Sequence, residues 1–183
     1  MPSQLTSLPN LVTYGRIAAV PLVCLLIAPG YYWLRWIALV IFIVAAASDW
    51  VDGYLARKLD QGSALGKMLD PIADKLLVSA VLVVLAWDRS LSGLDLVPAI
   101  AIVLRETFIP GLREYLGNIQ IAVPVTTLAK WKTTTQLIAL GFIIAEYLIP
   151  GLGLISDIVL WLAAALTVWT GADYFMRAWP HLK

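Results

Sequence analysis

The chain has 183 residues, of which 61% are hydrophobic and only 14% are charged, with a net charge of +1. Its mean hydropathy of +0.84 excludes an ordinary soluble domain and predicts a membrane protein. No basic tract is present, so we expect no nucleic-acid partner. The single Cys24 excludes a disulfide framework and a cysteine-rich metal site. The length predicts one domain over residues 1–183.

Apolar runs separated by breakers predict an all-α integral membrane protein with six transmembrane helices. Each run is close to the roughly 20 residues that a helix needs to cross a bilayer. Pro29-Gly30 ends the first run and Pro150-Gly151 ends the fifth. In chain order the predicted helices cover residues 10–28, 33 to beyond 50, 70–87, 94–113, 127–147 and 154–179.

Basic residues gather at one end of these predicted helices. Only Arg35 and Arg89 lie near the other end. The positive-inside rule therefore predicts that both chain termini are cytoplasmic. The residues at the predicted cytoplasmic end are Arg57, Lys58, Lys67, Arg113, Lys130, Lys132, Arg177 and Lys183.

Two pairs of aspartates lie at the cytoplasmic end of the second and third predicted helices. Asp49 and Asp52 are three residues apart and Asp70 and Asp74 are four apart, so each pair shares one helix face. A carboxylate near the bilayer core costs roughly 2.5–3.5 kcal/mol, so these side chains need compensation. The alternative is that they are solvated charges at helix ends. Pro71 leaves Asp70 either at the helix cap or inside the helix.

A short turn from Lys58 to Leu65 brings the two pairs together. Oxygen ligands without a nearby His or Cys favour Mg²⁺ or Mn²⁺, and two such ions roughly 4 Å apart can bridge a diphosphate. Gly53, Ala56 and Gly66 leave room for a nucleotide beside the helix backbone. Arg57 can neutralise phosphate oxygens. The pattern therefore indicates phosphoryl transfer at the membrane surface.

These residues resemble the signature of the CDP-alcohol phosphotransferase family without departure. The family's architecture of six spans with cytosolic termini is also the one predicted here. The resemblance implies transfer of a phosphatidyl group from CDP-diacylglycerol to an alcohol, with release of CMP. The matching residues are Asp49-x-x-Asp52-Gly53-x-x-Ala56-Arg57 and, after eight residues, Gly66-x-x-x-Asp70-x-x-x-Asp74.

The resemblance also implies a role for each residue. Two divalent cations, Mg²⁺ or Mn²⁺, are expected on Asp49, Asp52, Asp70 and Asp74. Asp74 is in addition the expected general base. Arg16 belongs to the same first-helix segment as Asn10, which also suits a helix N-cap after Pro9. A homodimer in the bacterial inner membrane is implied, with membrane lipids as partners and the site facing the cytosol. The residues expected to contact CDP-diacylglycerol are Asn10, Thr13, Gly53, Ala56, Arg57, Ser63 and Gly66.

A second group of cations predicts a pocket for an acceptor that already carries phosphate. Arg105 lies inside a predicted span, and Arg113 follows two helical turns later on the same face. We assign Arg105, Arg113 and Lys130 to this pocket. For Lys132 we favour the alternative, a marker of the cytoplasmic side. The other alternative is that Glu106 and Glu114 pair locally with the arginines.

The acceptor is inferred from two segments. Arg105 to Glu114 and Lys130 to Gln136 resemble the bacterial phosphatidylglycerophosphate synthases of this family, which implies glycerol 3-phosphate as acceptor. Another acceptor, such as inositol phosphate or serine, stays open. An ion-coupled transporter is the rival class, but it predicts internal repeats and helices broken near mid-bilayer, which the sequence lacks. No role is predicted for Lys75.

Overall fold

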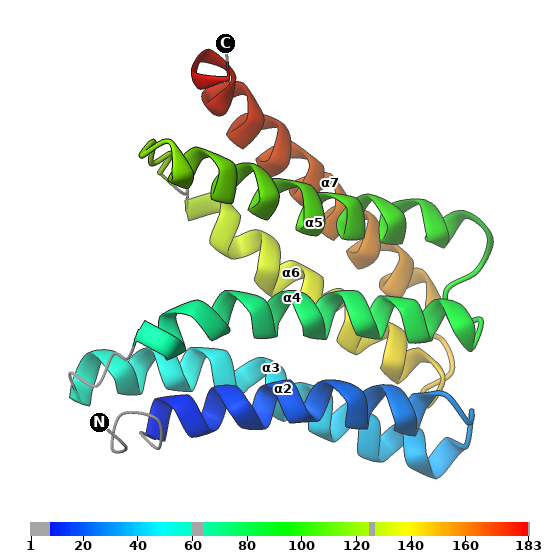
Figure 1. Cartoon of the computed structure of the whole chain (residues 1–183). Coiled ribbons are helices and arrows are strands. Elements are labelled where there is room, and N and C mark those ends of the chain that lie inside the picture. The colour runs from blue at the N-terminus through cyan, green and yellow to red at the C-terminus, as the bar shows by residue number, and fades with distance from the viewer. Residues whose placement is uncertain (1–7, 60–63, 125–126, 183) are drawn as a thin grey trace.

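The computed structural model describes the backbone of residues 8–59, 64–124 and 127–182, with the side chains there except those at 8, 9, 49–59, 64, 65, 67, 127 and 130. This part of the chain contains helices and no strand, so the all-helical prediction is confirmed (Figure 1). The elements are α2 (Leu8–Ile27), α3 (Tyr32–Leu59), α4 (Ala64–Trp87), the short 3₁₀ helix η1 (Gly93–Asp95), α5 (Leu96–Asn118), α6 (Thr127–Glu146), α7 (Gly153–Ala178) and η2 (Trp179–His181).

The six long helices alternate in direction, so both chain termini lie at the same end of the molecule (Figure 1). We call this the terminal end. The helices form two groups. In one, α2 packs against α3 and α4; in the other, α7 packs against α5 and α6. The groups meet where α6 contacts α3 and α4, and where α5 contacts α4.

The observed α4 begins at Ala64, six residues before the predicted start at Asp70. Asp70 and Pro71 therefore lie inside the helix, and the alternative in which Asp70 caps it is wrong. A proline inside a helix removes one backbone hydrogen bond. The helix continues through it because its next turns, at Ala73, Leu77 and Val81, are fully packed into the core. As a result Asp70 and Asp74 lie one helical turn apart.

Two clusters of buried apolar residues hold the helices together. The larger lies between the two helix groups and includes Val23, Phe42, Leu85, Ile144 and Leu160. The smaller lies at the terminal end between α5, α7 and their flanking segments. It consists of Ile109, Leu116, Val123, Tyr174 and Ala178. It supports the basic pocket described below.

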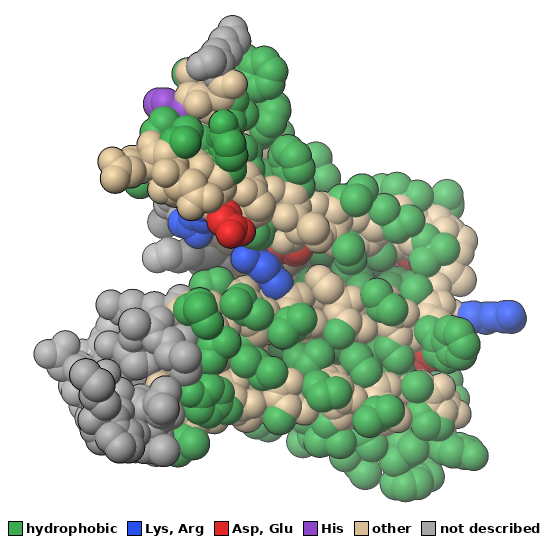
Figure 2. Space-filling model, viewed as in Figure 1, with side chains coloured by type: hydrophobic (Ala, Val, Ile, Leu, Met, Phe, Trp, Pro, Cys, Tyr) green, Lys and Arg blue, Asp and Glu red, His purple; other side chains and the backbone are tan. Residues whose placement is uncertain are grey.

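The sides of the molecule are apolar. Large side chains such as Leu25, Trp87, Leu154 and Trp169 are each at least 70% exposed, and Figure 2 shows hydrophobic side chains over most of the visible face. An exposed surface of this kind is typical of a protein whose sides contact lipid. Among the described residues, Asn10–Ile27 and Gly153–His181 are long and apolar enough to cross a membrane, and Tyr32–Ser48 is a shorter apolar stretch.

A buried arginine joins the two helix groups at the end opposite the termini. Arg35 of α3 is fully buried and forms an ion pair with Asp88, just after α4. It also donates hydrogen bonds to Ser90 Oγ (2.6 Å) and to the carbonyl oxygen of Ile144 in α6 (3.4 Å). Its guanidinium lies 4.8 Å from the centre of the Tyr147 ring. A buried charge of this kind is stable only with such partners.

Candidate functional site

Two polar side chains of α2 hold the two described aspartates of α4. Thr13 and Arg16, both buried, lie on one face of α2. Thr13 Oγ1 donates a hydrogen bond to Asp70 Oδ1 at 2.7 Å. Arg16 Nη1 donates to Asp74 Oδ1 at 2.8 Å and forms an ion pair with it. The spacing of three residues on α2 and the spacing of four on α4 are each about one helical turn, so the two contacts form side by side. Each carboxylate is therefore oriented by one side chain of α2.

Arg16 also connects α2 to the helix that carries the other predicted pair. Its Nε donates to Ser48 Oγ at 3.3 Å, and the Ser48 hydroxyl donates to the carbonyl oxygen of Ala45 at 2.7 Å. Ser48 directly precedes Asp49 in α3. The buried guanidinium therefore contacts both aspartate-bearing helices, and it is fixed by a charged partner and a neutral one.

The other residues predicted for this centre are placed only in part. Asn10 is buried one turn before Thr13, and Gly66 is buried near the start of α4. Within the described residues, no three of His, Cys, Asp and Glu gather in one place. Asp70 and Asp74 lie one helical turn apart on α4. Their carboxylate oxygens are the ligands that Mg²⁺ and Mn²⁺ prefer. The side chains of Asp49, Asp52, Gly53, Ala56 and Arg57, and all of Ser63, lie outside the described residues.

A basic pocket opens between α4, α5, α6 and α7 near the terminal end. Its volume is about 140 Å³, close to the liquid volume of roughly five water molecules. Among the described residues, five cationic side chains and one carboxylate line it, and Figure 2 shows charged side chains in a hollow between the two helix groups. The described lining residues are Lys75, Arg105, Ile109, Pro110, Arg113, Pro124, Ala129, Lys132, Thr170, Asp173, Tyr174 and Arg177.

The cations of this pocket include two that the sequence analysis assigned to it. Arg105 and Arg113, two turns apart on α5, both lie in the lining. The side chain of Lys130 lies outside the described residues. Arg177 is an addition: it contacts Asp173 one turn earlier, with Nε and Nη2 at 3.1 and 3.0 Å from Oδ1. The i, i+4 spacing on α7 was a signal for this pair.

Lys75 places the basic pocket next to the aspartates. It directly follows Asp74 in α4, so it points about 100° further around the helix. Asp74 contacts α2, whereas Lys75 lines the pocket formed with α5, α6 and α7. No role for Lys75 was predicted from the sequence. Two sites of opposite charge are therefore neighbours on one helical turn.

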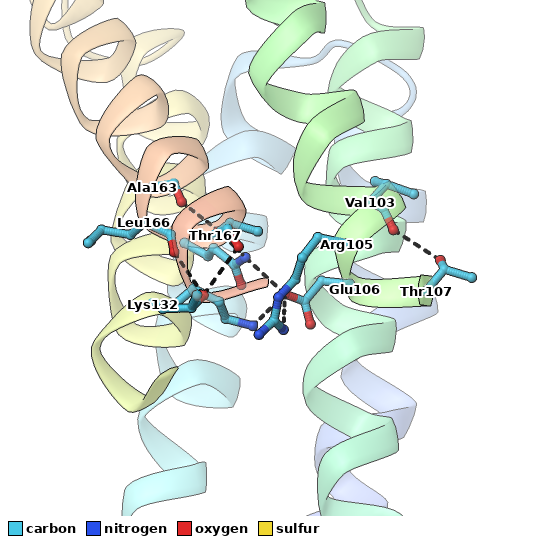
Figure 3. A network of polar contacts seen from close by, with 10 residues as sticks. Val103, Arg105, Glu106, Thr107, Lys132, Ala163, Leu166 and Thr167 are labelled. Atoms are coloured by element: carbon cyan, nitrogen blue, oxygen red, sulfur yellow. Dashed lines mark hydrogen bonds and ion pairs between the residues drawn. The ribbon is translucent and has the colours of Figure 1, made fainter. Parts of the chain in front are cut away.

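A buried carboxylate, Glu106, contacts two cations of the pocket wall (Figure 3). Glu106 Oε1 forms an ion pair with Lys132 Nζ and accepts hydrogen bonds from Arg105 Nη1 (3.3 Å) and Gln136 Nε2 (3.1 Å). Gln136 Nε2 also donates to Thr167 Oγ1 at 2.8 Å. The network links α5, α6 and α7, and it holds two cations of the pocket wall at one anion.

This network changes two interpretations of the sequence. Lys132 is only 4% exposed and is paired, so its interpretation as a marker of the cytoplasmic side is wrong. Local pairing of Arg105 with Glu106 is observed, yet Arg105 also lines the pocket. The two alternatives for Arg105 are therefore compatible. Gln136 and Thr167 were missed because no local pattern marks them.

Comparison with known proteins agrees with this geometry. The profile of the CDP-alcohol phosphatidyltransferase family matches residues 6–169. A Rickettsia bellii protein named CDP-diacylglycerol–glycerol-3-phosphate 3-phosphatidyltransferase is 42% identical over 172 residues, which cover 92% of this chain and 93% of that protein. The Arabidopsis thaliana protein with this name and the number 2 is 40% identical, and the match covers 99% of this chain and 85% of that protein. The Cereibacter sphaeroides protein with this name is 36% identical, and the match covers 97% of each chain. The chain therefore belongs to the CDP-alcohol phosphatidyltransferase family and is a transferase.

Proposed function

We propose that this chain transfers the phosphatidyl group of CDP-diacylglycerol to glycerol 3-phosphate, giving phosphatidylglycerophosphate and CMP in phospholipid biosynthesis. One observation carries the proposal: on α4, Asp74 belongs to the aspartate centre and Lys75 to a pocket lined by five cations. An acceptor that carries both a hydroxyl and a phosphate needs a base and an anion site side by side. The names of the relatives support the same pair of substrates.

The proposed setting is the inner membrane of a bacterium. Residues 1–183 form one domain whose six helices span the bilayer, with both termini and the aspartate centre on the cytosolic side. The apolar sides of the molecule support the span. The basic residues at the terminal end support the orientation. A homodimer is part of this proposal, with surrounding membrane lipids as partners.

We assign two divalent cations, Mg²⁺ or Mn²⁺, to Asp49, Asp52, Asp70 and Asp74. Carboxylate oxygens without His or Cys fit these hard ions. When bound, the ions neutralise the charge of the diphosphate. Thr13 and Arg16 orient Asp70 and Asp74 through one oxygen each, which supports a preorganised centre.

The proposed chemistry needs one proton transfer and one displacement. Asp74 accepts the proton of the acceptor's hydroxyl as the oxygen attacks the phosphorus that carries diacylglycerol. The bond from that phosphorus to the CMP oxygen breaks, and CMP leaves. Asp74 then gives the proton to solvent. The residues proposed to hold CDP-diacylglycerol are Asn10, Thr13, Gly53, Ala56, Arg57, Ser63 and Gly66.

The phosphate of the acceptor is assigned to the basic pocket. Arg105, Arg113 and Lys130 are its proposed ligands, and we add Lys75, Lys132 and Arg177, which line the same pocket. Arginine binds phosphate oxygens with two parallel hydrogen bonds, and such charged contacts are stronger than neutral ones. The pocket therefore favours a phosphorylated acceptor over serine, which has no phosphate.

Purified protein incubated with CDP-diacylglycerol, Mg²⁺ or Mn²⁺ and single acceptors tests this assignment. The expected result is phosphatidylglycerophosphate and CMP in equal amounts with glycerol 3-phosphate, and neither product with EDTA. Lipid analysis by mass spectrometry identifies the product. A lipid formed only from serine or inositol phosphate would refute the acceptor. Ion flux in vesicles without CMP release would refute the transferase.

Replacing Arg113 by Ala is expected to raise KM for glycerol 3-phosphate about tenfold or more, because a charge-assisted contact to phosphate is lost. KM for CDP-diacylglycerol should stay unchanged, since the pocket lies on the other side of α4 from Thr13 and Arg16. Arg89→Ala is the matched control: Arg89 is exposed at the opposite end. Equal increases of both KM values in Arg113→Ala would contradict the pocket.

A further inference from the structure

Gly171 of α7 leaves the space in which Arg105 lies. A methyl group at position 171 would place its carbon 2.9 Å from Arg105 Cγ and 3.5 Å from Nε. Carbon atoms in contact normally stay about 3.5–4.0 Å apart. Cγ belongs to the stem of the arginine, near the backbone of α5, so relieving this contact moves the whole guanidinium. A side chain at position 171 would therefore displace Arg105.

Four other helical glycines do not have this environment. A methyl group at Gly15, Gly111 or Gly117 would meet no atom within 4 Å, and at Gly141 it would meet only Phe42 Cε1 at 3.8 Å. A glycine inside a helix lowers stability by roughly 1 kcal/mol relative to alanine. At Gly171 the same missing side chain that lowers helix stability also leaves the space that Arg105 occupies.

Glu106 holds the same arginine from the other side. Its Oε1 accepts the hydrogen bond from Arg105 Nη1 and pairs with Lys132. Arg105 Nε is buried without a hydrogen-bond partner among the described residues. A buried donor without an acceptor is unfavourable. The position of Arg105 is thus set by the gap at Gly171 and the anion at Glu106, and not by the best hydrogen bonding of its own head group.

We propose that Gly171 and Glu106 are positioning residues that fix Arg105 and Lys132 in the wall of the basic pocket. Neither residue is among the lining residues, so each acts through a cation that is. The proposal rests on the proposed function, in which this pocket holds the acceptor's phosphate. Under this proposal the affinity of the pocket for the acceptor depends on Gly171, a residue with no side chain.

Steady-state kinetics of Gly171→Ala test the proposal. KM for glycerol 3-phosphate should rise about tenfold, the change expected when one charged contact is lost. KM for CDP-diacylglycerol should not change. Gly141→Ala is the matched control, because it makes the same substitution in a helix at ordinary contact distance. It should leave both KM values at the wild-type level. Alanine favours the helix in both variants, and thermal unfolding in detergent checks that both fold.

A double-mutant cycle separates positioning from a general packing effect. If Gly171 acts through Arg105, adding Gly171→Ala to Arg105→Ala should not raise the acceptor KM further. An equal rise in both backgrounds would overturn the proposal, as would an unchanged KM in Gly171→Ala alone. Glu106→Gln should also raise this KM, and Glu106→Asp, which keeps the charge, should restore part of the affinity.

The same variants distinguish this proposal from the proposed function. If Arg105→Ala raises the acceptor KM and Gly171→Ala does not, the positioning role is refuted and the pocket stands. If Arg105→Ala leaves the acceptor KM unchanged, Arg105 does not bind the acceptor's phosphate, and the positioning role and the assignment of that phosphate to this pocket are refuted, while the product assay still decides the proposed function.

Discussion

Replacing Asp74 by Asn is expected to reduce phosphatidyl transfer at least about a thousandfold, a loss within the range that general bases contribute. The amide keeps the size of the side chain and an oxygen that can accept the hydrogen bond from Arg16. It cannot take the proton of the acceptor's hydroxyl. The measurement is the rate of CMP release, with circular dichroism to show that the helical fold is retained.

Asp157→Asn makes the same chemical change at the opposite end of the molecule, where Asp157 is exposed at the start of α7. This control should keep the wild-type rate. A rate for Asp74→Asn within about tenfold of wild type would be too small a loss for a general base and would remove Asp74 from proton transfer.

Replacing Arg16 by Gln is expected to lower the rate at least about a hundredfold, because misplacing a catalytic group by about 1 Å has effects of this size. Arg16 holds Asp74 and contacts Ser48 of α3 while fully buried. The free energy of unfolding should also fall by about 1–3 kcal/mol, since a partly buried carboxylate loses its cation. Rate and unfolding temperature are measured on the same preparation.

Arg35→Gln separates these two effects. Arg35 is also a buried arginine paired with an aspartate, but it lies at the end opposite the termini. Its replacement should lower the unfolding temperature and leave the rate per folded molecule unchanged. If both variants lose rate in proportion to stability, Arg16 serves folding alone.

Local sequence patterns predicted the helices because long apolar runs that end at breakers such as Pro29-Gly30 and Pro150-Gly151 are typical of helices. The start of α4 was the largest error. Lys67, Asp70 and Pro71 interrupt the apolar pattern there, so the sequence suggested a loop or a cap. The helix forms through them because the residues that follow are buried in the core. Tertiary packing overrode the local signal.

The site was predictable where it depends on spacing within one helix. Arg105 and Arg113 share the pocket because eight residues make about two turns. Contacts between helices were not predictable: Thr13 meets Asp70 across 57 positions and Arg16 meets Asp74 across 58. The burial of Lys132 likewise depends on Glu106, 26 positions earlier. No local rule encodes such distances.

The cluster around Arg35 connects the two helix groups at the end opposite the termini. Its side chain contacts the segment after α4 and the backbone of α6, so it links the two helix groups. Separating the groups there would break the hydrogen bond to Ile144 and the contact with the Tyr147 ring, whereas the ion pair with Asp88 would stay within one group. Movement between the groups is therefore resisted at this end by polar contacts as well as by apolar packing.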